Sequence, residues 1–245
     1  MKGKIYVIGL GPGGKQDMTY RAVAALHECD VIAGYTTYID LIKADFADKE
    51  FIVTGMRKET ERCKAAVETA RQGKTVAMVS SGDAGIYGMA GIMYEVAEAY
   101  DDVDIEVVPG ITAAGSGGAL LGAPLVADSC LISLSDLLTP LEKIMKRVEA
   151  AAETDFVICL YNPASKGRPD YFRQACERIL KYRGGDTVCG LVSNIGREGQ
   201  HMEVMSLREI KDRAVDMFTT VYIGSPRTRK IGQYMVTPRG YRYEG

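Results

Sequence analysis

The sequence predicts an α/β fold with two domains, an N-terminal one built on a mostly parallel sheet and a C-terminal one built on a mixed sheet. Short apolar runs alternate with amphipathic stretches along the chain, which is typical of βαβ units. Three of these runs end in loops of small residues, at 9–14, 81–91 and 109–115. Ligands of α/β proteins bind at such strand ends, so the same pattern predicts a binding edge.

The elements of the first half follow from their apolar spacing and their flanking residues. Asp17 is expected to cap the first helix, and Gly73 to end the third. A bare apolar helix at 114–122 is expected to pack at an interface. The expected strands are 4–10, 31–33, 51–53, 75–79 and 104–108, and the remaining expected helices are 17–28, 38–42, 59–72 and one that ends near 100.

A change of pattern between 122 and 140 predicts a connector, because this segment contains two prolines and no long helical period. We therefore expect domains at 1–126 and 127–245. The second half alternates as well, but in hairpin-like pieces, which favours the mixed sheet. Its expected helices are 139–152, 169–182 and 206–213, and its expected strands are 156–161, 187–193, 202–205 and 219–223.

Composition excludes several classes of protein. The net charge of −2 over 245 residues argues against nucleic acid as a partner. No apolar run reaches the roughly 18 residues of a membrane span, and the chain opens on a strand-like run, so no membrane and a cytoplasmic location are expected. The six cysteines form no CxxC pair and are expected to be buried free thiols. With only two histidines, no metal site is expected.

The segment SGDAGIYGMAG at 81–91 is the most informative one, because four glycines and two alanines surround a single carboxylate, Asp83. So little side-chain bulk leaves backbone N–H and C=O groups open to a ligand. The alternative is a tight turn in which Asp83 bonds its own backbone.

A dinucleotide site is the rival interpretation of the first loop. Gly9, Gly11 and Gly14 match the G-x-G-x-x-G pattern of dinucleotide-dependent oxidoreductases. However, Pro12 lacks the N–H that a pyrophosphate needs, and no acidic residue ends the second expected strand. No nucleophile stands beside a base in any of the three loops either. Loops that offer only backbone suit a ligand that brings its own reactivity, and S-adenosylmethionine is such a ligand.

Six motifs, spread in order over nearly the whole chain, resemble those of the tetrapyrrole methylase family. They are GLGPG (9–13), GDAGIYG (82–88), PGITAA (109–114), YNPASKGR (161–168), NIGREGQ (194–200) and GSPRT (224–228). SLSDLLTP (133–140) is most similar to the branch that methylates carbon 17 of precorrin-3B or cobalt-factor III in cobalamin biosynthesis, with contraction of the ring. Leu141 stands where that branch usually has tryptophan, and Pro226 stiffens the last loop, so both differences bear on the local fit of the substrate.

The resemblance implies a homodimer with its active site in the cleft between two α/β domains, S-adenosylmethionine as methyl donor, S-adenosylhomocysteine as product, and an anionic tetrapyrrole substrate with or without cobalt. It also implies site residues. Those for the donor are Pro12, Gly82, Asp83, Ile86, Thr112, Ala113, Tyr161, Asn162, Ile195, Gly224 and Ser225. Those for the substrate carboxylates are Ser133, Arg168, Arg197 and Arg227, with Lys166 and Arg229 as further candidates.

For proton movement during ring contraction, the motifs single out Ser135, Asp136 and Tyr161 as catalytic candidates. Asp136 has a second possible role as the N-cap of the next helix. Three rival functions stay open for the whole chain. These are methylation of another carbon of a precorrin or uroporphyrinogen, a diphthine-type methylation, and tetrapyrrole binding without activity.

Overall fold

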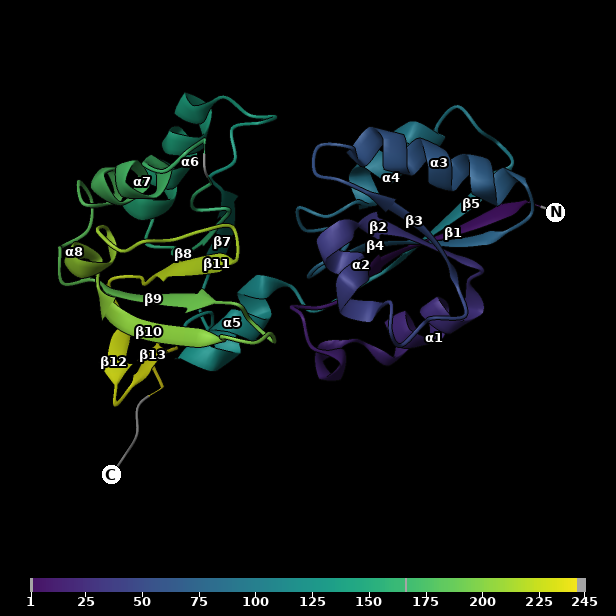
Figure 1. The fold of residues 1–245 in the computed structure, drawn as a ribbon. Coiled ribbons are helices and arrows are strands. Elements are labelled where there is room, and N and C mark those ends of the chain that lie inside the picture. The colour runs from purple at the N-terminus through teal and green to yellow at the C-terminus, as the bar shows by residue number, and fades with distance from the viewer. Residues whose placement is uncertain (1, 166, 242–245) are drawn as a thin grey trace. The chain divides into compact units, whose positions relative to one another are not determined.

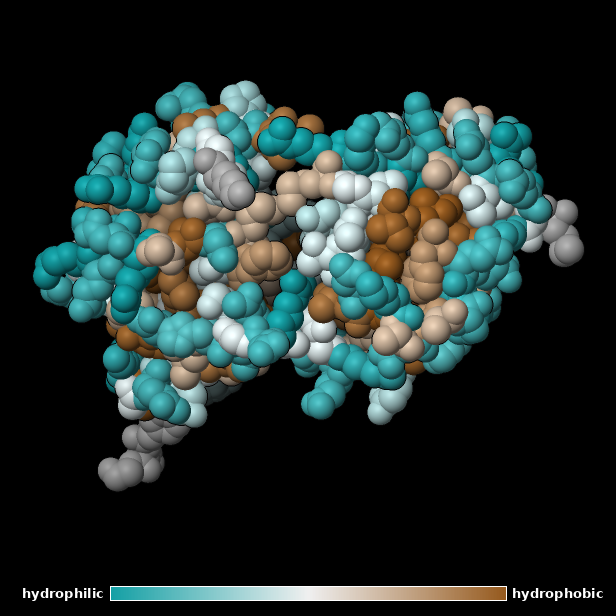
Figure 2. All heavy atoms as spheres, in the orientation of Figure 1, coloured by the Kyte–Doolittle hydropathy of each residue, from teal (hydrophilic) through white to brown (hydrophobic). Residues whose placement is uncertain are grey.

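The computed structural model describes residues 2–165 and 167–241, whose contacts divide the chain into two compact units, Met1–Ala113 and Ala114–Gly245. Each unit is built on its own five-stranded sheet, the first parallel and the second mixed, so the predicted fold class is confirmed (Figure 1). The expected boundary at residue 126 lies inside the second unit. Polar side chains cover most of the face that Figure 2 shows, interrupted by apolar patches. Among the described residues, no helix is long and apolar enough to cross a membrane.

In the first unit all five strands are parallel, in the order β3-β2-β4-β1-β5. Their carboxyl ends therefore meet at one edge of the sheet, and the three small-residue loops follow β1, β4 and β5 there. The strands are β1 (Gly3–Gly9), β2 (Val31–Tyr35), β3 (Glu50–Thr54), β4 (Thr75–Ser80) and β5 (Val103–Val108). The helices are α1 (Tyr20–Glu28), α2 (Thr36–Ile42), α3 (Glu59–Arg71) and α4 (Ala90–Ala97), with a 3₁₀ turn η1 (Lys15–Asp17).

Helices cover both faces of this sheet, because its strands are apolar on both sides. Ile5 and Val7 of β1 belong to a core with α3 and α4, whereas Tyr6 and Ile8 belong to a second core with α1 and α2. This is the two-sided burial expected of a parallel sheet.

The predicted N-cap of the first helix is wrong by two residues. Asp17 ends η1, and the N-cap of α1 is Thr19, whose hydroxyl accepts from the Ala22 N–H at 3.1 Å. Threonine and aspartate are both good N-caps, so the sequence alone did not distinguish the two positions.

The second unit has the sheet order β10-β9-β11-β8-β7, in which β7 and β8 are parallel and the other neighbours antiparallel. The sequence missed β7, which lies inside the expected connector, and the small sheet β12-β13-β6. The strands are β6 (Gly122–Ala123), β7 (Ser129–Ser133), β8 (Val157–Tyr161), β9 (Val188–Ser193), β10 (His201–Ser206), β11 (Thr219–Ile223), β12 (Arg229–Ile231) and β13 (Tyr234–Val236). The helices are α5 (Ala113–Leu121), α6 (Leu141–Glu153), α7 (Tyr171–Ile179) and α8 (Leu207–Ile210).

Helices α6, α7 and α8 share a core with one face of this sheet. The opposite face packs against α5, where the contact requires glycine on both sides. A Cβ on Gly117 of α5 would stand 2.5 Å from the Tyr222 hydroxyl, and a Cβ on Gly190 of β9 would stand 2.5 Å from Leu121. The backbone of α5 therefore packs closely against the sheet, with little side-chain bulk between them.

We expect Gly117→Ala to lower the free energy of unfolding by about 1–3 kcal/mol, because the new methyl group overpacks against the buried Tyr222 ring. Helix propensity alone predicts the opposite sign, a gain of about 1 kcal/mol. Urea unfolding followed by circular dichroism decides between them, with Gly184→Ala, which meets nothing within 4 Å, as the control. Tyr222→Phe in the same chain should relieve part of the loss; a stabilised Gly117→Ala variant would contradict the packing.

Candidate functional site

The loops that follow β1, β4 and β5 are joined backbone to backbone. Gly11 and Gly82 exchange two hydrogen bonds, at 3.0 and 2.7 Å, and both have positive φ angles, +77° and +68°. A Cβ on Gly9 would stand 2.5 Å from the Gly82 carbonyl oxygen and 2.7 Å from the Gly110 nitrogen. These glycines are therefore required for the loops to touch, in addition to any ligand that they accept.

The Asp83 carboxylate holds two of these loops together. One oxygen accepts from the N–H groups of Gly85 (2.8 Å) and Ile86 (3.1 Å), and the other accepts from the Gly110 N–H (3.0 Å). The turn predicted as the alternative role of Asp83 accounts for the first two bonds. The third crosses to the loop after β5, which makes Asp83 a link between two strand ends.

The backbone of Gly82 faces that of Thr112 and Ala113 beside this link, and a Cβ at Gly82 would stand 3.9 Å from both, in ordinary van der Waals contact. Of the other expected donor residues in this unit, Pro12 is buried and Ile86 half-buried. The edge thus presents mainly backbone, as predicted from the composition of its loops.

In the second unit, one edge of the sheet gathers the ends of β7, β8 and β9 and the start of β11, because β11 runs antiparallel to its two neighbours. Asn162 follows β8 and Asn194 follows β9, and each has a φ of +51°. Asparagine tolerates this left-handed conformation better than most residues, so both strands turn sharply at the same edge.

Ser133 and Arg168 belong to the hydrogen-bond network beneath this edge. The Ser133 hydroxyl accepts from the Asn162 side chain (3.0 Å) and from the Ser135 N–H (3.2 Å). The Arg168 guanidinium is buried and donates to the carbonyls of Leu134 (2.8 Å) and Asn162 (3.4 Å) and to the Ser165 hydroxyl (3.1 Å). Arg168 therefore faces the carbonyls of its own chain.

Asp136 does not cap the following helix, whose N-cap is Pro140. Its carboxylate instead accepts from the Tyr171 hydroxyl at 2.8 Å and lies 3.9 Å from Arg168. The hydrogen bond to Asp136 raises the pKa of Tyr171. The sequence missed Tyr171, because nothing in its local pattern distinguishes it from a surface residue of α7.

Two tyrosines from neighbouring strands hold the first turn of α5. The Tyr161 hydroxyl accepts from the Ala114 N–H at 2.7 Å, and the Tyr222 hydroxyl donates to the Ala114 carbonyl at 3.0 Å. Ala114 is the first residue of the second unit. Tyr161, a catalytic and donor-site candidate, thus also anchors the chain where this unit begins.

The loop after β9 places Arg197 and Ile195 at the same edge. Ile195 is buried against α5, and the Arg197 guanidinium lies over the Phe218 ring at 5.4 Å from its centroid. The loop is fixed by the Arg197 N–H bond to Asn194 (2.9 Å) and by the Gln200 side chain, which accepts from the Gly196 N–H (2.8 Å). Phe218, which the sequence did not single out, precedes β11 and so meets this edge.

The structure does not bring the loop 224–228 to this edge. Gly224 follows β11, whose antiparallel direction places its end beside Val188 at the start of β9; the Gly224 N–H donates to the Val188 carbonyl at 2.9 Å. Ser225 is buried, and its N–H donates to the Thr228 hydroxyl. Arg227 is exposed in this loop, Arg229 is exposed in β12, and Lys166 lies outside the described residues.

Arg183 supports the loop 224–228 from within. Its side chain is 5% exposed and donates to four backbone carbonyls, at distances of 2.6–3.2 Å. Burial lowers its pKa. The acceptors are the carbonyls of Ala151, Ala152, Phe156 and Gly224.

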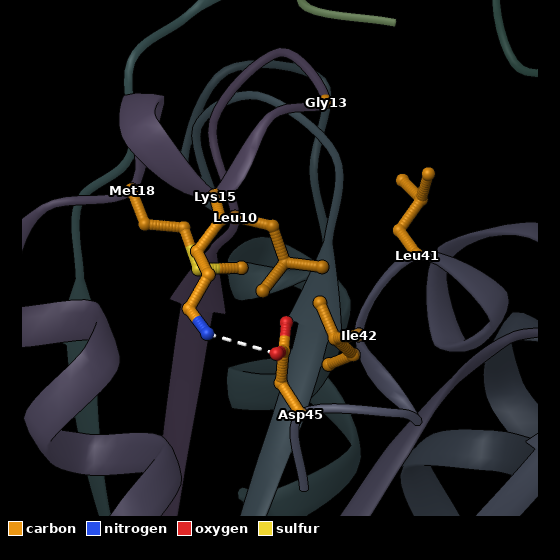
Figure 3. Close-up of a pocket in the computed structure, with 7 residues that line it drawn as sticks. All are labelled: Leu10, Gly13, Lys15, Met18, Leu41, Ile42 and Asp45. Atoms are coloured by element: carbon orange, nitrogen blue, oxygen red, sulfur yellow. Dashed lines mark hydrogen bonds and ion pairs between the residues drawn. The ribbon is translucent and has the colours of Figure 1, made fainter.

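The first loop does not have the context of a dinucleotide site. Helix α1 begins only at Tyr20, and the N–H groups of Leu10 and Gly11 already donate to the carbonyls of Ser80 and Gly82. A small cavity beside the loop is bridged by the ion pair of Lys15 with Asp45, at 2.8 Å (Figure 3). Its volume of about 10 Å³ is at most that of one water molecule.

Within residues 2–165 and 167–241, no three His, Cys, Asp or Glu side chains are grouped so that they could hold a metal ion. The six cysteines are free thiols, five of them buried, as predicted. Burial raises the pKa of Cys29 and Cys63 to about 11, so neither thiol is poised as a nucleophile.

The sequence profile of the tetrapyrrole (corrin/porphyrin) methylases matches residues 4–211, and the chain belongs to this family. The resemblance found in the motifs is therefore confirmed.

Among its relatives is a probable cobalt-factor III C(17)-methyltransferase of Salmonella typhimurium, 46% identical over 96% of this chain and 98% of that protein. A cobalt-factor III methyltransferase of Priestia megaterium is also 46% identical, over 99% of this chain, which spans 46% of that protein's length. A precorrin-3B C(17)-methyltransferase of Sinorhizobium is 37% identical over 98% of both chains.

The crystal structure of the methyltransferase CobJ superposes with a TM-score of 0.90 and 36% identity, covering 96% of this chain and all of that one. A uroporphyrin-III C-methyltransferase of Thermus thermophilus, solved with S-adenosylhomocysteine, has a TM-score of 0.70 at 19% identity and covers 91% and 92% of the two chains. The second likeness concerns the fold alone.

We expect Arg183→Gln to lower the free energy of unfolding by about 2–4 kcal/mol, since it leaves several buried carbonyls without a donor. Arg173→Gln, which breaks an exposed ion pair with Glu177, should cost less than about 1 kcal/mol. Urea titration of both variants by circular dichroism compares them directly. Equal midpoints would mean that the Arg183 bonds contribute nothing net.

Proposed function

We propose that this chain is an S-adenosylmethionine-dependent methyltransferase that acts on carbon 17 of cobalt-factor III, with ring contraction, in cobalamin biosynthesis. The observation that carries the proposal is the 46% identity that extends over 98% of the Salmonella relative. Precorrin-3B is the second candidate substrate, because the relative named for it is less similar, at 37%.

The donor site is proposed at the carboxyl edge of the first unit's sheet. The backbone of Gly82, Thr112 and Ala113 lies together there with little side-chain bulk, which suits contact with the flat adenosyl group. Pro12, Asp83 and Ile86 would complete the part of the site that this unit carries. Tyr161, Asn162 and Ile195 of the second unit stay predicted donor residues. When bound, S-adenosylmethionine supplies an electrophilic methyl group. The chain's own contribution is to align the reactants and exclude water.

The substrate is proposed to bind at the edge of the second unit's sheet that carries Asn162 and Arg197. The half-buried Arg197 guanidinium, held over Phe218, suits a bidentate bond to a propionate or acetate of the macrocycle. Ser133 would contribute through the Asn162 side chain. For Arg168 we propose a positioning role, because its donors are directed to the carbonyls of Leu134 and Asn162.

Proton transfer during ring contraction is assigned to Asp136, with Ser135 and Tyr161 as further candidates. Asp136 is half-buried, which leaves part of its carboxylate accessible, and the Tyr171 hydroxyl fixes its rotamer. Tyr171 is thus a positioning residue for Asp136. Gly224, Ser225 and Arg227 are left out of the proposed site, since their loop lies at the opposite edge of the sheet.

Calorimetric titration with S-adenosylhomocysteine, with NADH as the control ligand, tests the proposal first. We expect micromolar binding of S-adenosylhomocysteine and none of NADH. Methyl transfer from S-adenosylmethionine to cobalt-factor III, followed by mass spectrometry of the product, tests the substrate. Binding of NADH alone would support an oxidoreductase instead. The homodimer and the cytoplasmic location remain predictions, for sedimentation velocity and cell fractionation to test.

We expect Asp83→Ala to weaken binding of S-adenosylhomocysteine about tenfold or more, because the loops after β4 and β5 lose the acceptor of three N–H groups. The pH profile of the remaining methyl transfer should not change, because the carboxylate is engaged with backbone amides. Calorimetry measures the first effect, with Asp40→Ala, an exposed aspartate of α2, as the control. Unchanged affinity in the Asp83→Ala variant would contradict the role of this carboxylate.

A further inference from the structure

We infer that Leu137 and Leu138, at the tip of the loop between β7 and α6, form the apolar contact for the macrocycle of the substrate. The inference rests on the proposed function and adds to it two residues that determine substrate binding. It is carried by three observations: the exposure of both leucines, the anchoring of the loop on each side of them, and their place at the edge of the sheet.

The two side chains are neighbours in sequence and are 64% and 98% exposed. Single exposed apolar residues are common on protein surfaces and need no explanation. Two adjacent leucines at the tip of one loop are different, because both are available to a ligand at the same time. Another adjacent apolar pair of this unit, Met217 and Phe218, is less exposed, at 43% and 48%, and the Arg197 guanidinium lies over the Phe218 ring.

The loop is held firmly below its tip. The Leu134 N–H donates to the Tyr161 carbonyl (2.9 Å), and the Leu134 carbonyl accepts from the buried Arg168 guanidinium (2.8 Å). Asp136 accepts from the Tyr171 hydroxyl (2.8 Å). Beyond the tip, the Pro140 carbonyl accepts from the first turn of α6, at 3.0 and 3.2 Å. The leucines are thus presented by a fixed base, which reduces the entropy lost when a ligand binds them.

The position of the tip matches the shape of the proposed substrate. The loop leaves β7 at the same edge of the sheet at which Arg197 follows β9, three strand spacings away in the order β9-β11-β8-β7. That separation is roughly 14 Å, which a macrocycle with its carboxylate chains can span. An apolar tip at one end and a cation at the other suit a flat, largely apolar ring that carries anionic side chains.

The same geometry makes a peptide or a second copy of the chain a poorer occupant. A stable protein interface requires roughly 800 Å² from each partner, and the tip consists of two side chains. The base beneath it carries the catalytic candidates Ser135 and Asp136. A covering protein would therefore close the proposed reaction site. A substrate molecule of the tetrapyrrole class fits both the small area and the adjacent chemistry.

The test compares the wild-type chain with Leu137→Ser, Leu138→Ser and the double variant, and with Val126→Ser as the matched control. Val126 is 42% exposed and precedes β7, so it lies toward the opposite edge. Affinity for cobalt-factor III is followed by its visible absorbance, which the protein does not obscure. Affinity for S-adenosylhomocysteine is measured by calorimetry, and the oligomeric state by sedimentation velocity.

We expect each leucine variant to weaken binding of cobalt-factor III about tenfold, and the double variant more, as the loss of one or two apolar contacts predicts. Affinity for S-adenosylhomocysteine and sedimentation should match those of the Val126→Ser control. Leu138→Met, which keeps an apolar side chain, should retain most of the affinity for cobalt-factor III that Leu138→Ser loses. Unchanged binding of cobalt-factor III in the double variant, or dissociation of an oligomer with substrate binding intact, would overturn the inference alone. A wild-type chain that binds S-adenosylhomocysteine but not cobalt-factor III would overturn the proposed substrate together with it.

Discussion

The close approach of three strand ends in the first unit is the constraint on which the proposed donor site depends. The loops after β1, β4 and β5 can meet because Gly9 and Gly110 lack side chains and because Gly11 and Gly82 adopt positive φ angles. The Asp83 carboxylate then joins the last two by accepting three N–H groups that would otherwise be unpaired at a crowded edge. A carboxylate used in this way fixes the conformation of the loops and is expected to take no part in proton transfer. This agrees with a reaction in which the methyl donor is itself the reactive group.

The proposed site of the second unit is made of side chains, in contrast to the backbone edge of the first unit. Its sheet is mixed, and the antiparallel β11 brings Phe218 to the edge where β8 and β9 end, while it carries Gly224 to the far edge. Buried arginines stabilise both edges. Arg168 holds the carbonyls of Leu134 and Asn162 at one edge, and Arg183 holds four carbonyls near the other. Arg168 also has the Asp136 carboxylate at 3.9 Å, whereas Arg183 has no carboxylate within 4.0 Å among the described residues. The positive charge of Arg183 is therefore balanced by carbonyl dipoles, which fix the geometry of its loop without a paired acid.

Much of this could be predicted from the sequence, and the limits have physical causes. Periodicity predicted the α/β class and most elements, because parallel strands buried on both faces read as short apolar runs. The small residues at the strand ends led to the prediction of a ligand-binding edge in the first unit, because they leave backbone N–H and C=O groups uncovered. Strand direction left no such local signal. The family motif assigned Gly224 and Ser225 to the donor site, and β11 carries their loop to the far edge of this sheet, whereas it brings Phe218, which was not singled out, to the edge with Arg197. Likewise, Arg168 and Arg197 look equivalent in sequence. Only the structure shows that Arg168 is buried and supports the loops, whereas Arg197 is half-buried at the edge of the sheet.

The difference between the two sheet edges bears on how the choice of substrate can vary within the family. The proposed donor edge is constrained by backbone contacts that allow no side chain at Gly9 or Gly110, so substitutions there are expected to disturb the fold before they alter binding. The edge of the second unit is less constrained. The base of the β7–α6 loop is fixed by Arg168 and Tyr171, whereas its tip at Leu137 and Leu138 makes few contacts with the rest of the chain and can change without cost to the base. A fixed base with an exposed tip would allow the tip to be fitted to macrocycles of different shape without moving the base. The tip of this loop is therefore the segment in which we expect the choice among tetrapyrroles to be made.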